Sequence, residues 1–266
     1  MLTQESRAPF KRGFAVVTAG RTGSHFLLSL LNSHWRILHH GEIFGEDRLR
    51  QPHIQQQIRE NGPLGYAERF LKGKFLRTTG IKIMYHHFDP AYAEAIGVGQ
   101  LQEFVDYIRN NTGFKIIHLK RRNHLRTLIS VEVAKMTKQY SLLDETQRIA
   151  DVSIELQAEY CIRSFEWFSS KEKEFDVFFQ HHPCLDVFYE DLAAKRKNEC
   201  NRILRFLGVS RRRLKTNFLK QNTRPLSQTI QNYHQLKEQL ASTEWAHFFD
   251  EPLMTENDRQ QESAQS

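Results

Sequence analysis

Short apolar runs alternate with longer mixed segments along this chain. The first run, residues 14–18 (FAVVT), lies between glycines and is typical of a strand buried on both faces. It leads into a glycine-containing loop at residues 20–24, and the leucines of residues 25–32 then fit a helix packed against a sheet. A strand, a tight loop and a helix in this order predict the first unit of a parallel α/β sheet.

The same alternation continues along the chain. Further interior strands are predicted at residues 36–40, 80–85, 115–119 and 185–189, and helices at residues 100–110, 123–138, 145–173 and 197–207. The polar segment 46–79 interrupts this order and predicts a helical insertion or lid. We therefore expect an α/β fold, a three-layer P-loop-like domain with a central parallel sheet over residues 12–253, and flexible tails at residues 1–11 and 254–266.

Composition excludes several classes of protein. Of the 266 residues 39% are hydrophobic, including 19 Phe, so the chain can bury a core and is not disordered throughout. The counts of 13 Gly and 7 Pro exclude a collagen-like chain. The formal net charge of +7 is dispersed, so it fits a pocket for an anionic ligand as well as a nucleic-acid surface.

Targeting features and cysteines favour a cytoplasmic location. No run reaches the ~18 apolar residues of a membrane helix, and the first residues lack the apolar core of a signal peptide. The odd count of 3 cysteines fits a reducing compartment better than a disulfide framework. Neither the cysteines nor the paired histidines show the spacing of a metal site, so we expect no metal.

The loop after the first strand, TAGRTGSH, is the sharpest local feature. A glycine turn that feeds a helix directs backbone N–H groups and the positive helix end at one spot, which is a phosphate site. Arg21 adds a fixed charge, and Thr22 and Ser24 add hydroxyl donors. The loop is not a Walker A motif, because Gly23 is followed by Ser24 and not by lysine. A structural turn with a surface arginine is the alternative.

A second anion site is predicted at the end of the 115–119 strand. Arg122 at a strand end can bind a phosphate through two parallel hydrogen bonds. Ser130 follows eight residues later, about two helical turns on, where its hydroxyl can reach the same ligand. Two such sites on neighbouring strand ends imply a ligand with two separated phosphates. A basic helix start and a helix-face serine explain the same residues without a ligand.

Together these residues resemble the sulfotransferase family that uses 3′-phosphoadenosine-5′-phosphosulfate (PAPS). The resemblance implies that Arg21, Thr22, Gly23, Ser24 and His25 hold the 5′-phosphosulfate, and that Arg122 and Ser130 hold the 3′-phosphate. It covers roughly residues 12 to 250 and is similar to the bacterial branch that sulfates carbohydrates and glycolipids. The further matching segments are GEIF (41–44), GIKIMY (80–85), FYEDL (188–192), RFLGV (205–209) and RPLS with NY (224–233).

The resemblance also implies a mechanism, in-line transfer of the sulfuryl group to an acceptor hydroxyl with a side chain as general base. It makes Glu42 the first choice for the base and Glu46 the second. Cytosolic relatives use a histidine two positions after a lysine, so His86 and His87, four and five positions after Lys82, are runners-up. Lys82 is expected to point at the sulfonate or the acceptor. Arg224 is expected to close over the nucleotide.

Two other functions fit parts of the sequence. A P-loop-like small-molecule kinase shares the strand, loop and helix but needs a lysine and magnesium ligands that are missing here. A basic module that binds nucleic acid or glycan explains the charge but leaves Glu42, Arg122 and Ser130 without a role. We therefore expect a PAPS-dependent enzyme with a carbohydrate or glycolipid acceptor, no nucleic-acid partner, and peripheral membrane contact if the acceptor is a lipid. Phenolic, steroid and peptide acceptors stay open, as does the oligomeric state.

Overall fold

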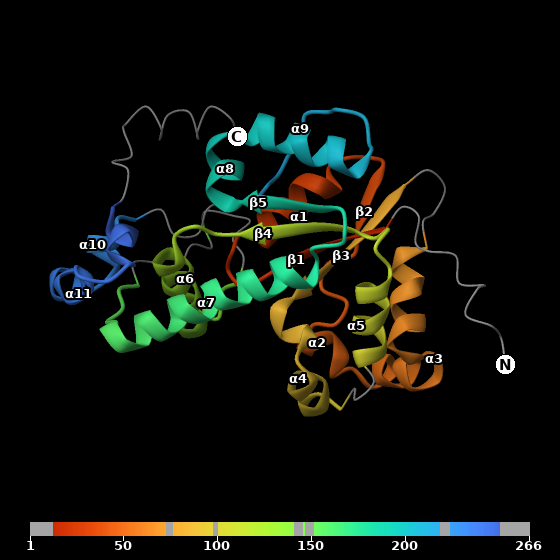
Figure 1. The fold of residues 1–266 in the computed structure, drawn as a ribbon, viewed down its shortest axis with the longest axis horizontal. Coiled ribbons are helices and arrows are strands. Elements are labelled where there is room, and N and C mark those ends of the chain that lie inside the picture. The colour runs from red at the N-terminus through yellow and green to blue at the C-terminus, as the bar shows by residue number, and fades with distance from the viewer. Residues whose placement is uncertain are drawn as a thin grey trace. The chain divides into compact units, whose positions relative to one another are not determined.

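The structure is a computed structural model that describes residues 13–72, 77–97, 101–140, 146, 152–218 and 224–250 (Figure 1). The chain forms two compact units. The sheet unit comprises Met1–Arg122 and Lys171–Thr216, and the helical unit comprises Asn123–Ser170 and Asn217–Ser266. The predicted boundaries at 12 and 253 and the predicted tails lie outside the described residues, so the single domain stays a prediction.

The sheet unit is built on five parallel strands in the order β2-β3-β1-β4-β5. They are β1 (Gly13–Thr18), β2 (Ile37–His39), β3 (Thr78–Met84), β4 (Lys115–Lys120) and β5 (Cys184–Phe188), each within two residues of its predicted position. The central strand β1 is buried along its whole length, as its continuous apolar run predicts. The chain runs from β1 to β2 and β3 on one side and then to β4 and β5 on the other, so the carboxyl end of β1 lies at a switch point, where ligands bind in such sheets.

Helices cover both faces of this sheet (Figure 1), which confirms the predicted three-layer α/β class. On one face α1 (Ser24–Asn32), α8 (Tyr189–Ala194) and α9 (Arg196–Leu207) lie over a core formed by Phe14, Val16, Leu27, Leu30, Ile117, Leu119, Ile203 and Leu204. The opposite face carries α2 (Glu46–Leu49), α3 (Pro52–Leu71), the 3₁₀ turn η2 (Tyr85–Phe88), α4 (Pro90–Ala95) and α5 (Leu101–Asn110).

The predicted helical insertion corresponds to α2 and α3. Helix α3 contains a kink, because Gly62 has φ 68° and ψ 164° immediately before Pro63. Beyond the kink, Tyr66 packs its ring 5.9 Å from that of Phe44, so α3 forms part of the protein core. The insertion ends before its predicted limit, because β3 already starts at Thr78. Its role as a lid stays a prediction.

One cross-strand row shows how closely the inner strands pack. Phe14 of β1 is in register with Gly80 of β3, and Gly80 is in register with His39 of β2. A Cβ atom on Gly80 would lie 2.2 Å from Cζ of Phe14, so the phenyl ring occupies the space a side chain would need. The ring reaches to 5.8 Å from the ring of His39, between their centroids. Gly80 therefore lets one aromatic ring cover three strands.

The helical unit contains α6 (His124–Thr137), the first part of α7 (Ala158–Phe178), α10 (Leu226–Thr229), α11 (Tyr233–Leu240) and the 3₁₀ turn η4 (Ala246–Phe249). Its core includes Leu125, Leu128, Phe165, Leu236 and Phe248. The predicted helix 145–173 is wrong over residues 152–157. There Ile154 forms a parallel bridge with Ile230 and donates its N–H to the carbonyl of Thr229. These backbone bonds to another segment replace those of a helix.

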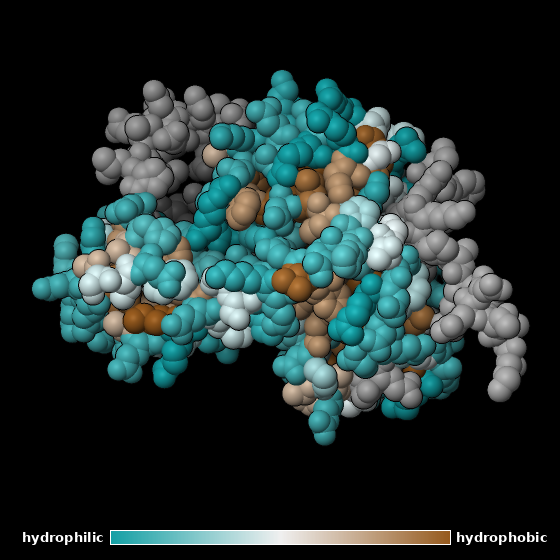
Figure 2. Space-filling model, viewed as in Figure 1, coloured by the Kyte–Doolittle hydropathy of each residue, from teal (hydrophilic) through white to brown (hydrophobic). Residues whose placement is uncertain are grey.

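The surface agrees with a chain that is 26% charged. On the face drawn in Figure 2 hydrophilic side chains predominate over the described residues. Among those residues, no helix combines the length and the apolar character needed to cross a membrane.

Candidate active site

The loop between β1 and α1 is folded by its own hydroxyl groups. Thr18, the last residue of β1, donates its hydroxyl to the carbonyl of Leu119 in β4 at 2.7 Å, and its hydroxyl also contacts that of Thr22. Thr22 is 2% exposed, and its hydroxyl bonds the carbonyl of Ala19 at 3.1 Å. The Thr22 hydroxyl therefore secures the loop from within. The loop's own conformation presents the backbone to a ligand.

Two residues in this loop adopt left-handed backbone conformations, Arg21 with φ 64° and Gly23 with φ 89°. Glycine at position 23 is required for two reasons. The φ value disfavours a side chain, and a Cβ atom there would lie 2.3 Å from Cδ2 of Tyr189. Helix α1 starts at Ser24 with no side-chain cap among the described residues, so its positive end faces outward at the sheet edge. This is the geometry of an anion site.

Arg121, which the sequence analysis did not single out, supports the loop from the neighbouring strand. Its guanidinium donates to the carbonyl of Arg21 at 3.2 Å and lies 4.9 Å from the ring centre of Tyr189. Burial lowers the pKa of Arg121 from its ordinary value. Tyr189 thus contacts both Gly23 and Arg121. The run of basic residues at the end of β4 was the available signal, but which of them turns toward the loop depends on the strand's orientation.

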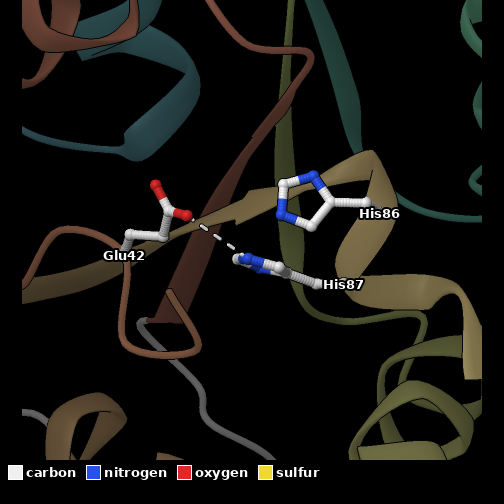
Figure 3. A group of neighbouring side chains, drawn as sticks. All are labelled: Glu42, His86 and His87. Carbon is white, nitrogen blue, oxygen red and sulfur yellow. Dashed lines mark ion pairs between the residues drawn. The ribbon is translucent and has the colours of Figure 1, made fainter. Parts of the chain in front are cut away.

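A carboxylate, an ammonium and an imidazole meet beside β3, and Figure 3 shows the carboxylate of Glu42 and the imidazole of His87. Glu42 follows β2 after Gly41, whose φ is 71°, and its Oε2 lies 2.6 Å from Nζ of Lys82. The Oε1 atom lies 3.3 Å from Nε2 of His87. The side chains of Lys82 and His87 are 6% and 2% exposed, whereas that of Glu42 is 28% exposed. Glu42 is therefore the member that a substrate can reach.

The proton of His87 can be assigned from its neighbours. Its Nδ1 accepts the backbone N–H of Met84 at 3.2 Å, so the proton of the neutral ring is on Nε2 and faces Glu42. Burial lowers the pKa of His87, which keeps the ring neutral. Burial alone would raise the pKa of Glu42, but the neighbouring His87 ring and the charge of Lys82 outweigh it and lower the pKa to about 2. Glu42 is therefore a carboxylate.

Two further histidines and a tyrosine surround this carboxylate. The exposed His86 packs its ring 4.6 Å from that of His87 and 4.7 Å from that of Tyr92, between centroids. Burial, and then the charges of Lys82 and Arg21, lower the pKa of His25 to about 4. Because His25 lies in the first turn of α1 and interacts electrostatically with Lys82, the anion loop and the carboxylate belong to one site.

The other predicted residues lie in different surroundings. Glu46 begins α2 and forms an ion pair with Arg50 on the helix surface. The Arg122 guanidinium pairs with Asp191 and lies 4.0 Å from the ring centre of Phe188, with 49% of its side chain exposed. Ser130 and Arg224 belong to the helical unit, so their approach to Arg122 stays a prediction. There the Arg224 carbonyl accepts a hydrogen bond from the Arg126 guanidinium at 2.7 Å.

Two groups of side chains in the described part of the chain have ligand atoms within 4.8 Å of one another, Glu42 with His86 and His87, and His118 with Asp176 and Asp186. A lysine ammonium lies against each group. Lys82 contacts Glu42, and Lys120 contacts Asp176 and Asp186. The His87 nitrogen that faces Glu42 also carries its proton and cannot bind a cation as it stands. These contacts favour the ion-paired state of both groups.

Comparison with known proteins shows what the chain is similar to. No protein-family model matches the chain. Nodulation protein H of Rhizobium tropici is 28% identical over 252 residues, which cover 91% of this chain and 94% of that protein. Nodulation protein H of Rhizobium meliloti strain 1021 is 26% identical over 245 residues, covering 89% and 94%. The solved sulfotransferase domain of the Synechococcus PCC 7002 olefin synthase has a TM-score of 0.51 at 14% identity, over 99% of this chain and 98% of that domain. The chain is similar to nodulation protein H along most of its length and has the fold of a solved sulfotransferase domain.

These similarities confirm the resemblance drawn from the sequence. A sulfotransferase from Alicyclobacillus acidocaldarius is also similar, with a TM-score of 0.49 at 16% identity, over 89% of this chain and 90% of that one. In this chain the loop after β1 and Glu42, which follows β2, lie at the same edge of the parallel sheet. The roles of the individual residues in the reaction are taken up as proposals.

Proposed function

We propose that this protein transfers the sulfuryl group of PAPS to a hydroxyl of a carbohydrate or glycolipid acceptor, with Glu42 as the general base. One observation carries the proposal. The Glu42 carboxylate is partly exposed and is held by Lys82 and His87 beside the loop that presents Arg21 and the start of α1. A base and an anion site in one place are what sulfuryl transfer to an alcohol requires. The similarity to nodulation protein H and to a solved sulfotransferase domain supports the same activity.

In the proposed step the acceptor oxygen attacks sulfur in line with the bond to the departing nucleotide. Glu42 takes the proton of the hydroxyl as the new S–O bond forms and the old one breaks. The negative charge that develops on the 5′-phosphate oxygen is stabilised by Arg21, by the loop N–H groups and by the positive end of α1. The other end of the nucleotide is held at its 3′-phosphate by Arg122 with Ser130, and Arg224 closes over it.

The Lys82 contact sets the strength of the base. While Lys82 pairs with Glu42, the low pKa of the carboxylate makes it a weak proton acceptor. The sulfonate of bound PAPS offers Lys82 a second anionic partner. We propose that Lys82 shifts toward it, which raises the pKa of Glu42 at the moment the acceptor hydroxyl arrives. His87 then remains as the hydrogen-bond donor that keeps the carboxylate in place.

The cysteines support the proposed cytoplasmic location. Cys161, Cys184 and Cys200 are all free thiols in the structure, as expected in a reducing compartment. Contact with a membrane surface is proposed only for a lipid acceptor.

The donor site is tested by calorimetric titration with 3′-phosphoadenosine 5′-phosphate (PAP), with ATP and magnesium as the comparison. We expect PAP to bind more tightly, and Arg21→Ala and Arg122→Ala to lose binding. Arg109→Ala is the matched control, because Arg109 pairs with Asp106 on the surface of α5. Retained PAP binding in both site variants, or preference for ATP with magnesium, would overturn the proposal.

The acceptor is then sought with labelled PAPS and a panel of oligosaccharides and glycolipids, with phenolic, steroid and peptide hydroxyls as comparisons. Turnover should persist with EDTA. Label transferred only to a non-sugar acceptor would refute the proposed acceptor class while leaving the donor assignment intact.

A further inference from the structure

A hydrogen-bonded chain of side chains lies beneath the turn that carries His86 and His87. The hydroxyl of Tyr85 lies 2.6 Å from Nε2 of His118, and Nδ1 of His118 lies 2.9 Å from Oδ1 of Asp176. Lys120 places Nζ 2.7 and 2.9 Å from the two Asp176 oxygens and 3.2 Å from Oδ1 of Asp186. The chain therefore connects η2 through β4 to α7 and β5.

With a neutral His118 ring, the protons along this chain have one consistent arrangement. Burial raises the pKa of Asp176, but the hydrogen bonds from His118 and Lys120 outweigh it and lower the pKa to about 2, so Asp176 is a carboxylate acceptor. His118 must then donate from Nδ1 and accept at Nε2, and Tyr85 donates its hydroxyl. Burial raises the pKa of Tyr85, which keeps that hydroxyl protonated. Each of the two imidazole nitrogens has a partner.

Aromatic packing fixes both ends of the same turn. Tyr85, its first residue, stacks on Phe175 of α7 with ring centroids 4.6 Å apart and planes at 11°. Phe88, its last residue, packs edge-on against Phe175 at 4.8 Å and against Phe178 at 5.2 Å. The two residues between them, His86 and His87, lie beside Glu42 instead (Figure 3). The turn therefore has an anchored side and a side that faces the carboxylate.

We propose that Tyr85, His118 and Asp176 are positioning residues that hold η2 so that His87 stays against Glu42, an inference that rests on the proposed role of Glu42. Stability of the core alone does not require these hydrogen-bonded side chains, since well-packed apolar residues commonly stabilise a core as well as a buried ion pair does. A fully satisfied polar chain fixes an orientation, because each donor has one acceptor in one direction.

The test compares two buried tyrosines that differ in their hydroxyl contacts. Tyr85→Phe keeps the ring on Phe175 and removes the hydrogen bond to His118. Tyr66→Phe is the matched control, because the buried Tyr66 hydroxyl has no hydrogen-bond partner among the residues that the structure describes. We expect Tyr85→Phe to lower kcat about tenfold with the KM for PAPS unchanged, and Tyr66→Phe to leave both unchanged.

A second measurement does not depend on turnover. In protein labelled with ¹³C-glutamate, the Glu42 carboxyl resonance is assigned with Glu42→Gln and titrated with acid. We expect its midpoint to rise in Tyr85→Phe, as the 3.3 Å contact between His87 and Glu42 loosens, and to stay in place in Tyr66→Phe. The other ionisable groups that act on this resonance are held constant between the variants: Lys82, His25, His86 and Tyr92.

A conservative change at position 118 separates positioning from packing. His118→Gln supplies an acceptor and a donor on one planar group, so it should retain more turnover than His118→Leu. The inference is overturned if folded Tyr85→Phe matches the wild type in both kcat and the Glu42 titration, or if Gln and Leu at position 118 behave alike. Should the wild type transfer no sulfuryl group at all, the proposed function fails, and the titration alone still decides whether the chain positions His87.

Discussion

Substitution of Gly23 by alanine tests how the anion loop is built. Two costs arise from the structure. A side chain at φ 89° costs about 1–2 kcal/mol. The new Cβ would also lie 2.3 Å from Cδ2 of Tyr189, and overlap of this kind in a packed site typically costs about 1–3 kcal/mol. The sum, about 2–5 kcal/mol of the free energy of unfolding, is a large part of the stability of an ordinary domain.

A matched glycine separates the two costs. Gly97 has φ 71°, and no atom of the described residues would lie within 4 Å of a Cβ atom there. Gly97→Ala therefore lowers the free energy of unfolding through the backbone conformation alone. In urea unfolding, Gly23→Ala should lower the free energy of unfolding by about 1–3 kcal/mol more than Gly97→Ala does. This difference is the cost of the overlap with Tyr189. The same loop change should weaken PAP binding in calorimetry, whereas Gly97→Ala should not.

A double-mutant cycle checks the cause directly. In a Tyr189→Ala background the ring is gone, so adding Gly23→Ala should cost no more than Gly97→Ala does in the wild type. Equal losses for the two single variants, or an unchanged Gly23→Ala cost without the Tyr189 ring, would refute the argument that this ring shapes the loop.

Further predictions concern the site residues. Glu42→Gln should lower kcat by about 10²–10⁴-fold with PAP affinity unchanged; normal turnover would move the role of base to Glu46 or His86. The folded pKa of Glu42, about 2, lies below the ordinary 4.5, so its contribution to stability is complete above about pH 4.5 and is lost as the pH falls toward 2. Acid unfolding followed by circular dichroism should thus depend less on pH in Glu42→Gln, and an identical slope would contradict the pairing. Arg122→Ala should weaken PAP binding at least about tenfold in calorimetry; a loss no larger than that of Arg109→Ala would argue against Arg122 as a phosphate ligand.

Local patterns in the sequence were sufficient for much of the fold. Apolar runs identified the inner strands β1, β3 and β4, because a parallel strand in the middle of a sheet is buried on both faces. The glycine loop could be predicted because its backbone conformation depends on residues that are adjacent in the sequence. Boundaries that depend on distant partners were not visible, as at Ile154, where a bridge to Ile230 replaces the predicted helix.

The site shows the same division. Glu42 and Lys82 were selected from short motifs, but their 2.6 Å contact depends on how β2 pairs with β3. Sequence reasoning ranked His86 and His87 together, whereas the structure brings His87 against Glu42. The backbone N–H of Met84 donates to Nδ1 of His87 and so orients that ring. The residue types in this segment do not predict this hydrogen bond. The contacts of Arg121 and of the Tyr85 chain likewise join residues far apart in sequence, so they could not be derived from a single chain.

The row of Phe14, Gly80 and His39 limits how this sheet can be altered. Since the Phe14 ring fills the volume above Gly80, a methyl group at position 80 has room only if position 14 becomes smaller. The two positions should therefore be exchanged as a pair in any redesign of the sheet. A protein with alanine at 80 and leucine at 14 keeps nearly the same side-chain volume and moves it from one strand to the next. The inner strands thus share a single packing volume, and neither strand can be redesigned alone.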